Sequence, residues 1–349
     1  MQVVAAFDAR DGRGLAERAA SLRERGPEVL LIVGAERRDS PIAGVVEAAR
    51  VAYGGVIRVV RAAEPASDEG AAAIAQLRGL RFGDRPLALE TLEERARSLQ
   101  IAEVLVCEVD ESGARLAAGS HDDVNGFELP GVGLGPSADG VARRAGARMV
   151  RRWLITDPLP DAASLRDRLA NLARFDAADT PAVEPLRRAL LRESLGAVAR
   201  AARADVDLEA LSRPRRIDLG GALAALAPAE AVGVALDAIS PQGATRITSG
   251  ERSLALVLAE RPRRGALELR ISDERGEREE RVAPGSLVVF PVVGRVTVRS
   301  GRGIFVEGDA AGELGLVIDA RPRPLELPER DGERVPLLRR WAAALAGTA

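Results

Sequence analysis

Hydrophobic and polar positions alternate in blocks along the first hundred residues, and these blocks predict strands and helices in turn. Apolar residues at helical spacing predict helices over 13–25 and 40–52. Short β-branched runs, typical of buried parallel strands, separate and flank them at 2–8, 27–35 and 54–62. This order predicts a mostly parallel sheet covered by helices.

The pattern continues with a helix over 86–100 and a strand over 102–109, and then it weakens. Residues 110–141 are polar and glycine-rich, which predicts loops with a short hairpin, and helices dominate from Ser137 to about Leu211. The next segments predict, in order, a strand, turn and helix at 216–226, a helix at 228–239, a strand at 243–250 and a helix at 251–261.

From Gly265 onward short apolar stretches separated by glycine turns predict strand after strand, and therefore a β-rich segment. The last element, 334–347, places Leu337, Leu338, Trp341 and Leu345 near one helical face. We expect this helix to close over the β-rich segment.

Composition narrows the function classes. The 50 basic and 52 acidic residues are spread along the chain and aromatic residues make up only 3%, which argues against nucleic-acid binding. Every basic residue is arginine, which excludes a Schiff-base lysine and a P-loop. The sequence shows no membrane-spanning run and no secretory leader, and the single Cys107 suits a reducing compartment. We therefore expect a cytoplasmic protein without membrane contact.

Two polar segments favour simple structural roles. The stretch "GVGLGPSADG" predicts a flexible start of a helix capped by Ser137, with an anion or nucleotide contact as the alternative. His121 stands beside Asp122 and Asp123, but no second histidine or cysteine cluster exists and no "GxSxG" accompanies them. A solvated loop is the better interpretation, so we assign no metal site and no catalytic residue.

Two further segments carry candidate chemistry. In "RIDLGGALAAL", Gly220 and Gly221 would let a planar ring or a phosphate approach the backbone, although close strand–helix packing would require the same glycines. Both interpretations stay open. Near the end, "IDARPRP" places Asp319, Arg321 and Arg323 at alternating positions before prolines, which predicts an exposed, charged edge strand.

Several ordered segments resemble one family. "GELGLVIDARPRPLELP" followed by "RVPLLRRWAAALAG" resembles the C-terminus of the glutamate mutase L family, also called MutL-type. "GVARRAGARMVRRWL" and "TPAVEPLRRALLRESLGAVARAA" resemble its central helices. "LGGALAALAPAEAVGVALDAISPQGATRITSG" and "APGSLVVFPV" resemble two later regions. The resemblance covers Glu128 to Ala349 well and Pro27 to Ala52 weakly.

The family is similar to the actin/Hsp70/sugar-kinase ATPases, in which two ribonuclease-H-like halves clamp ATP. The resemblance implies an α/β fold with such halves, the first incomplete, and a β-rich C-terminal appendage. Residues 1–100 would form the incomplete lobe, 101–263 the second lobe with a helical insertion, and 264–349 the β-rich domain with the terminal helix. Gly220 and Gly221 match the family's adenosine-binding glycine pair.

The departures from the family pattern concern the phosphate-binding segments. The initial hairpin of the type DIGSTxTK has no counterpart, and of the middle GGTDGG only Gly34 remains. In the second hairpin Glu108 stands where Asp is expected, and the glycine pair is lost. Phosphate cradles depend on glycine N–H groups and on a carboxylate that holds Mg²⁺ or water. We therefore expect a truncated, degenerate relative that does not hydrolyse ATP.

Members of this family are encoded beside adenosylcobalamin-dependent carbon-skeleton mutases, and the analogy with diol dehydratase reactivase implies that they exchange damaged cobalamin in an ATP-driven way. We expect an accessory, chaperone-like protein that binds such a mutase or a full-length relative. The alternative is a working ATP- and Mg-dependent reactivase whose missing hairpin another chain supplies. A homo-oligomer fits either reading.

Overall fold

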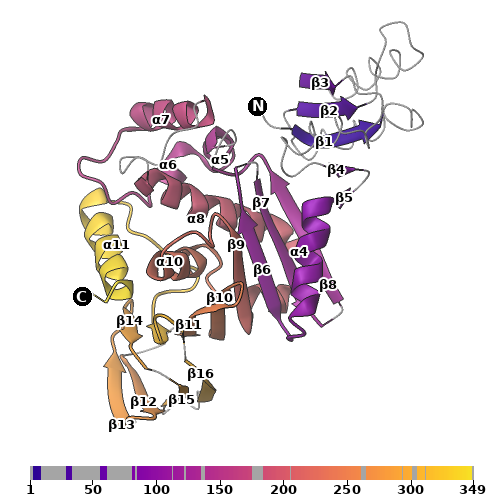
Figure 1. Cartoon of the computed structure of the whole chain (residues 1–349). Coiled ribbons are helices and arrows are strands. Elements are labelled where there is room, and N and C mark those ends of the chain that lie inside the picture. Colours follow the sequence, from indigo (N-terminus) through magenta and orange to yellow (C-terminus); the bar gives the residue numbers. More distant parts are fainter. Residues whose placement is uncertain are drawn as a thin grey trace, which may run out of the picture.

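The described residues form a mixed α/β fold with one large mixed sheet, a separate antiparallel sheet and a third sheet of N-terminal strands (Figure 1). The computed structural model describes residues 3–8, 29–33, 56–60, 81–82, 85–111, 113–121, 123–134, 138–174, 184–204, 206–260, 265–292, 294–300, 305–310 and 312–347.

The large sheet has eight strands in the order β14-β17-β11-β10-β9-β6-β7-β8. Strand β9 is parallel to β6 and β10, and β17 is parallel to β11, while the remaining neighbours are antiparallel. The strands are β6 (Val104–Val109), β7 (Gly113–Ser120), β8 (Asp123–Pro130), β9 (Arg216–Gly221), β10 (Gly243–Ser249), β11 (Arg252–Ala259), β14 (Leu287–Phe290) and β17 (Leu316–Asp319).

Helices cover both faces of this sheet. Successive strand residues point to opposite sides, so a strand with a continuous apolar run presents apolar side chains on both faces. Leu105 and Cys107 of β6 belong to the main core with the long helix α8, whereas Val104 and Val106 pack against α4 on the other face. The helices are α4 (Leu87–Ser98), α5 (Ala138–Ala145), α6 (Ala147–Arg151), α7 (Ala162–Arg174), α8 (Glu184–Ala201), the 3₁₀ turn η1 (Ala202–Ala204), α9 (Leu208–Ser212), α10 (Pro228–Ala238) and α11 (Asp331–Leu345).

The smaller antiparallel sheet has the order β13-β12-β15-β16 and extends from the β11 side of the main sheet (Figure 1). Its apolar face forms a second core with residues of β11 and β17, among them Leu256 and Ile318. The strands are β12 (Leu267–Asp273), β13 (Gly276–Val282), β15 (Arg295–Ser300) and β16 (Phe305–Asp309). The β-rich pattern predicted after Gly265 is confirmed.

The N-terminal strands also follow the prediction. Strands β1, β2 and β3 are parallel neighbours, and the short β4 and β5 extend their sheet in the order β3-β2-β1-β4-β5. Their bounds are β1 (Val3–Asp8), β2 (Val29–Val33), β3 (Val56–Val60), β4 (Arg81–Phe82) and β5 (Arg85–Pro86). The helices predicted over 13–25 and 40–52 lie outside the described residues.

Four local predictions were wrong. The segment 251–261 contains a strand, β11, because its apolar residues are buried on both faces of the sheet and do not follow one helical stripe. Residues 110–141 contain the predicted hairpin, but as two eight-residue strands of the main sheet and not as a short hairpin among loops. The helix predicted directly after Gly221 does not form, since residues 222–225 are turns, whereas the helix predicted at 228–239 is confirmed as α10. The terminal helix α11 packs against α10 and β14 of the main body and does not close over the smaller sheet (Figure 1).

The expected charged edge strand was also wrong. β17 lies inside the main sheet between β14 and β11, and Asp319, Arg321 and Arg323 are buried. Asp319 accepts hydrogen bonds from the Nε and Nη2 atoms of Arg321, at 2.9 and 2.7 Å, and from Nη2 of Arg323, at 2.5 Å. These pairs make the burial of charge tolerable.

Arg321 joins two helices to this strand end. Its Nη1 donates to Asp237 of α10 at 2.7 Å, and its guanidinium lies 4.7 Å from the ring of Trp341 in α11. Asp237 also accepts from Arg192 of α8 at 2.7 Å. The alternating charges therefore form a buried ionic cluster of three arginines and two aspartates: Arg192, Asp237, Asp319, Arg321 and Arg323.

Removing the central carboxylate should destabilise the fold strongly. We expect Asp319→Ala to lower the free energy of unfolding by about 3–5 kcal/mol, because two buried guanidinium groups lose their shared partner. Glu313→Ala, which breaks the exposed pair with Arg252, should cost less than about 1 kcal/mol. Urea unfolding of both variants is the measurement, and equal losses would contradict the cluster's role.

The same cluster predicts acid sensitivity. Burial alone would raise the pKa of Asp319, but the charges and hydrogen bonds of Arg321 and Arg323 hold that pKa below its ordinary value. The resulting stabilisation is fully present above about pH 4 and is lost as the pH falls through the lowered folded-state pKa. Urea unfolding between pH 6 and pH 3 should therefore show a shallower pH dependence for Asp319→Asn than for the natural protein. Parallel curves would contradict this.

Candidate functional site

One face of the main sheet carries a row of polar side chains. The row consists of Glu108 of β6, Asp218 and Arg216 of β9, and Arg246 and Thr248 of β10. These residues share one face because the strand register places them side by side and alternate residues of a strand point the same way. Helix α4 covers the β6 side of the face and contributes Arg95. We call these six residues the polar strip.

Asp218 is the centre of the polar strip. Its carboxylate is buried and accepts from the hydroxyl of Thr248 at 2.8 Å, from the backbone N–H of Gly250 at 3.1 Å and from Arg95 at 2.6 Å. Arg95 also lies 3.5 Å from Glu108. Such a charge, paired and hydrogen-bonded at once, is held in a fixed position.

The structure brings together three of the four residues that the resemblance implied for a nucleotide. Gly220 lies opposite Glu108 in the β6–β9 ladder, and Gly221 follows it with φ +57. A Cβ on Gly220 would stand 2.6 Å from Glu108 Cγ and Oε1 and 3.0 Å from Arg95 Nη1. The space in front of Gly220 is thus taken up by the protein's own side chains, which favours the packing interpretation of this glycine.

Gly221 is required for a different reason. A Cβ there would stand 2.6 Å from the backbone oxygen of Val109, and the positive φ disfavours any other residue. The conformation turns the chain away at the end of β9, and the amide of Ala222 then donates to that same oxygen at 2.9 Å. Gly34, the fourth implied residue, lies outside the described residues.

The remaining sequence candidates do not join the polar strip. His121 is exposed in the turn between β7 and β8 with φ +50, next to the exposed Asp123. Asp122 and Ser137 lie outside the described residues. Within the described ranges, no three His, Cys, Asp or Glu residues group as a metal site requires, and no helix has the length and apolar character to cross a bilayer.

Cys107 neighbours the polar strip in sequence but points into the opposite core. Burial, followed by the charges of Asp218 and Glu108, raises the pKa of its thiol far above the ordinary value. The thiol therefore stays protonated and is not a nucleophile.

A cavity of about 470 Å³ lies on the other face, between α8, α10 and α11, with Trp153 and Trp341 in its walls. Its arginines already face carboxylates: Arg321 and Arg192 pair with Asp237, and Arg188 pairs with Glu230 at 2.7 Å. The cavity adjoins the buried ionic cluster, and each of its arginines is paired with a carboxylate.

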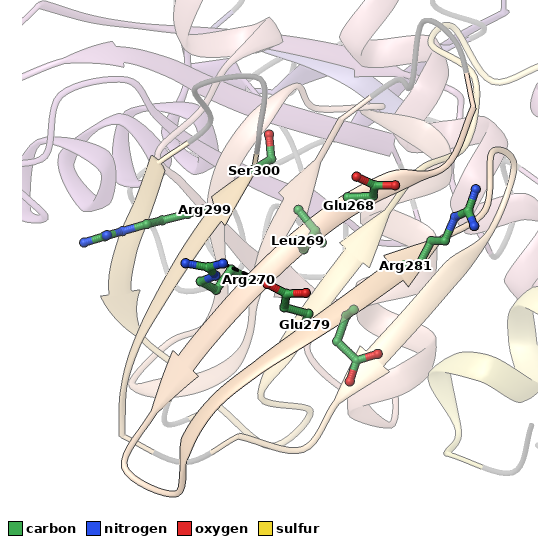
Figure 2. Close-up of a pocket in the computed structure, with 8 residues that line it drawn as sticks. Glu268, Leu269, Arg270, Glu279, Arg281, Arg299 and Ser300 are labelled. Atoms are coloured by element: carbon green, nitrogen blue, oxygen red, sulfur yellow. Dashed lines mark hydrogen bonds and ion pairs between the residues drawn. The ribbon is translucent and has the colours of Figure 1, made fainter.

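A shallow hollow of about 540 Å³ lies on the exposed face of β12, β13 and β15 (Figure 2). Figure 2 shows Arg270 and Glu279 pointing toward one another across the two strands, at 2.8 Å. Arg270 also pairs with Glu277 at 3.1 Å. Cross-strand pairs of this kind stabilise a solvated sheet face and protect the edge strand β13 from unwanted pairing.

Sequence reasoning missed most of the polar strip. Arg95 follows the polar, solvent-facing positions of its helix, so nothing in the sequence singled it out. Thr248 and Arg246 belong to a strand that was predicted, but to which no functional role was assigned. The alternation of polar residues in "RID" and "TRITS" was the available signal, because both strands otherwise sit in a buried sheet.

Comparisons with known proteins are sparse. No family model matches the sequence, and no curated protein matches it. Among solved structures, the type II variant of the Aquifex aeolicus Ppx/GppA phosphatase matches distantly, with 15% identity, a TM-score of 0.20 and coverage of 62% of this chain and 53% of that chain. The chain thus spans about half the length of that protein. No specific family follows from this, and the domain boundaries and the expected actin-like fold remain predictions.

Substitutions at the glycine pair test how the polar strip is packed. Gly220→Ala should cost about 1–3 kcal/mol, because the new methyl overlaps the Glu108 side chain. Adding Glu108→Ala should recover most of that loss. Gly221→Ala should be destabilising in either background, since its obstacle is the Val109 backbone. Urea unfolding of the four variants measures this, and an unrelieved Gly220→Ala would contradict the packing.

Proposed function

We propose that this protein is a non-catalytic accessory factor built on an actin-like ATPase scaffold. One observation carries the proposal: Glu108 and Arg95 occupy the space in front of Gly220, where the sequence resemblance implies adenosine. Arg95 is held there by Asp218 at 2.6 Å, so clearing the space would break a charge pair with a buried carboxylate.

The chemistry of the polar strip supports the same proposal. Its carboxylates, Asp218 and Glu108, are engaged by Arg95, while nucleotide hydrolysis needs a carboxylate that holds Mg²⁺ or water. Carboxylates held by an arginine suit a scaffold that keeps its shape without cycling through nucleotide states.

We further propose, from the sequence resemblance, that the partner is an adenosylcobalamin-dependent carbon-skeleton mutase or a full-length relative of this chain. In this role the protein would assist assembly or reactivation through contact alone. The β-rich segment and α11, which carry the C-terminal part of the resemblance, are the parts that we expect to contribute the contact.

Nucleotide binding is the direct test. Calorimetry of the full chain with Mg-ATP up to 5 mM should show no saturable heat, and phosphate release should not exceed that of buffer. Binding or turnover that Gly220→Arg abolishes would overturn the proposal in favour of a working reactivase. The double variant Arg95→Ala/Glu108→Ala is the matched control: it removes both side chains in front of Gly220, so nucleotide binding gained only in this double variant would support their closing role.

The partner is tested separately. The full chain, immobilised and exposed to native extract, should enrich mutase subunits or a full-length relative, as identified by mass spectrometry. If neither a mutase subunit nor a full-length relative is enriched, the accessory role is contradicted, while the conclusion about nucleotide binding still stands.

A further inference from the structure

Two arginines stand side by side at one end of the polar strip. Arg216 opens β9, and Arg246 is its register partner in the parallel strand β10. Neighbouring strands are about 4.8 Å apart and paired residues point to the same side. Two like charges placed opposite one another weaken a sheet, so this arrangement calls for a compensating negative charge.

No carboxylate among the described residues pairs with either arginine. Arg216 donates to the Thr248 hydroxyl at 3.0 Å and to the Gly250 carbonyl at 3.3 Å, and Arg246 donates to the Asp309 carbonyl at 3.2 Å. These acceptors are neutral. Thr248 and Gly250 also donate to Asp218, but the direct ion pair of that carboxylate is with Arg95, so within the described part of the chain neither arginine of the pair has a carboxylate of its own. By contrast, Arg252 on the adjacent strand faces Glu313 at 2.7 Å.

Both arginines line a hollow of about 390 Å³ between the main sheet and β16. Leu256 and Val306 give it an apolar wall. The one acidic residue among its lining residues, Glu307, pairs with Arg295 at 2.5 Å. The hollow therefore keeps its positive charge.

We propose that this hollow binds the phosphoryl group of a small organic phosphate, with the two guanidinium groups on the phosphoryl oxygens and the organic part against the apolar wall. Two arginines match the charge of a dianion and can each donate two hydrogen bonds to its oxygens. The site is about 13 Å along β9 from Gly220, and the proposal does not rest on the accessory function.

The first experiment is calorimetry of the full chain with inorganic phosphate, glycerol phosphate and acetate. Both phosphates should bind saturably, with glycerol phosphate the tighter ligand, and acetate should bind at least tenfold more weakly. Arg216→Gln and Arg246→Gln should each weaken phosphate binding at least tenfold, while Arg252→Gln should leave it unchanged. Absence of saturable binding, or equal binding by the variants, would overturn the site, and acetate binding as tight as phosphate would overturn its preference for a dianion.

A second measurement does not require ligand. At low salt and without phosphate, Arg246→Gln should raise the melting temperature by about 1–2 °C, because it relieves the repulsion from Arg216. Sodium chloride at 1 M should remove this difference, and phosphate should raise the melting temperature of the natural protein only. A lower melting temperature for Arg246→Gln at both salt concentrations would contradict the repulsion. If the binding heat measured with Mg-ATP persists in Gly220→Arg and vanishes in Arg216→Gln, the nucleotide binds through its phosphates in this hollow and not at the glycine pair.

Discussion

The burial of Arg321 is the constraint on which the architecture depends. A guanidinium inside a protein costs several kcal/mol unless carboxylates surround it, so Asp319 and Asp237 must both be in place. Asp319 ends β17 and Asp237 belongs to α10, while Trp341 of α11 covers the group and donates to the Gly285 carbonyl before β14. One side chain thus ties the last strand and the last helix to the body of the protein.

The two faces of the main sheet use arginine in opposite ways. In the buried ionic cluster each guanidinium meets an aspartate, and tryptophan rings cover Arg192 and Arg321. Along the polar strip only the Arg95 end is compensated, through Asp218, and the Arg216 end is held by neutral oxygens. The first arrangement fixes the fold, and the second leaves positive charge available for an outside partner.

Elements with a local hydrophobic pattern could be predicted from the sequence. The prediction failed where contacts between residues far apart in the sequence determine the position of a strand or a side chain. The parallel order of β1–β3, the helix α8 and the strands after Gly265 follow from periodicity alone. "IDARPRP" was misjudged because nothing local shows that Asp237, some eighty residues earlier, balances Arg321. Likewise Glu108 and Gly220 were named as candidates from the sequence, but Arg95, which lies beside both, is brought there only by the packing of α4 on the sheet.

The place of β17 has a consequence for the order in which the chain is made. Its slot between β11 and β14 can be filled only after more than three hundred residues have left the ribosome, although β11 and β10 are finished much earlier. Until then β11 keeps an unpaired, apolar border that invites pairing with another polypeptide. The nascent chain is therefore most exposed to wrong pairing while residues 260–315, between β11 and β17, are being made.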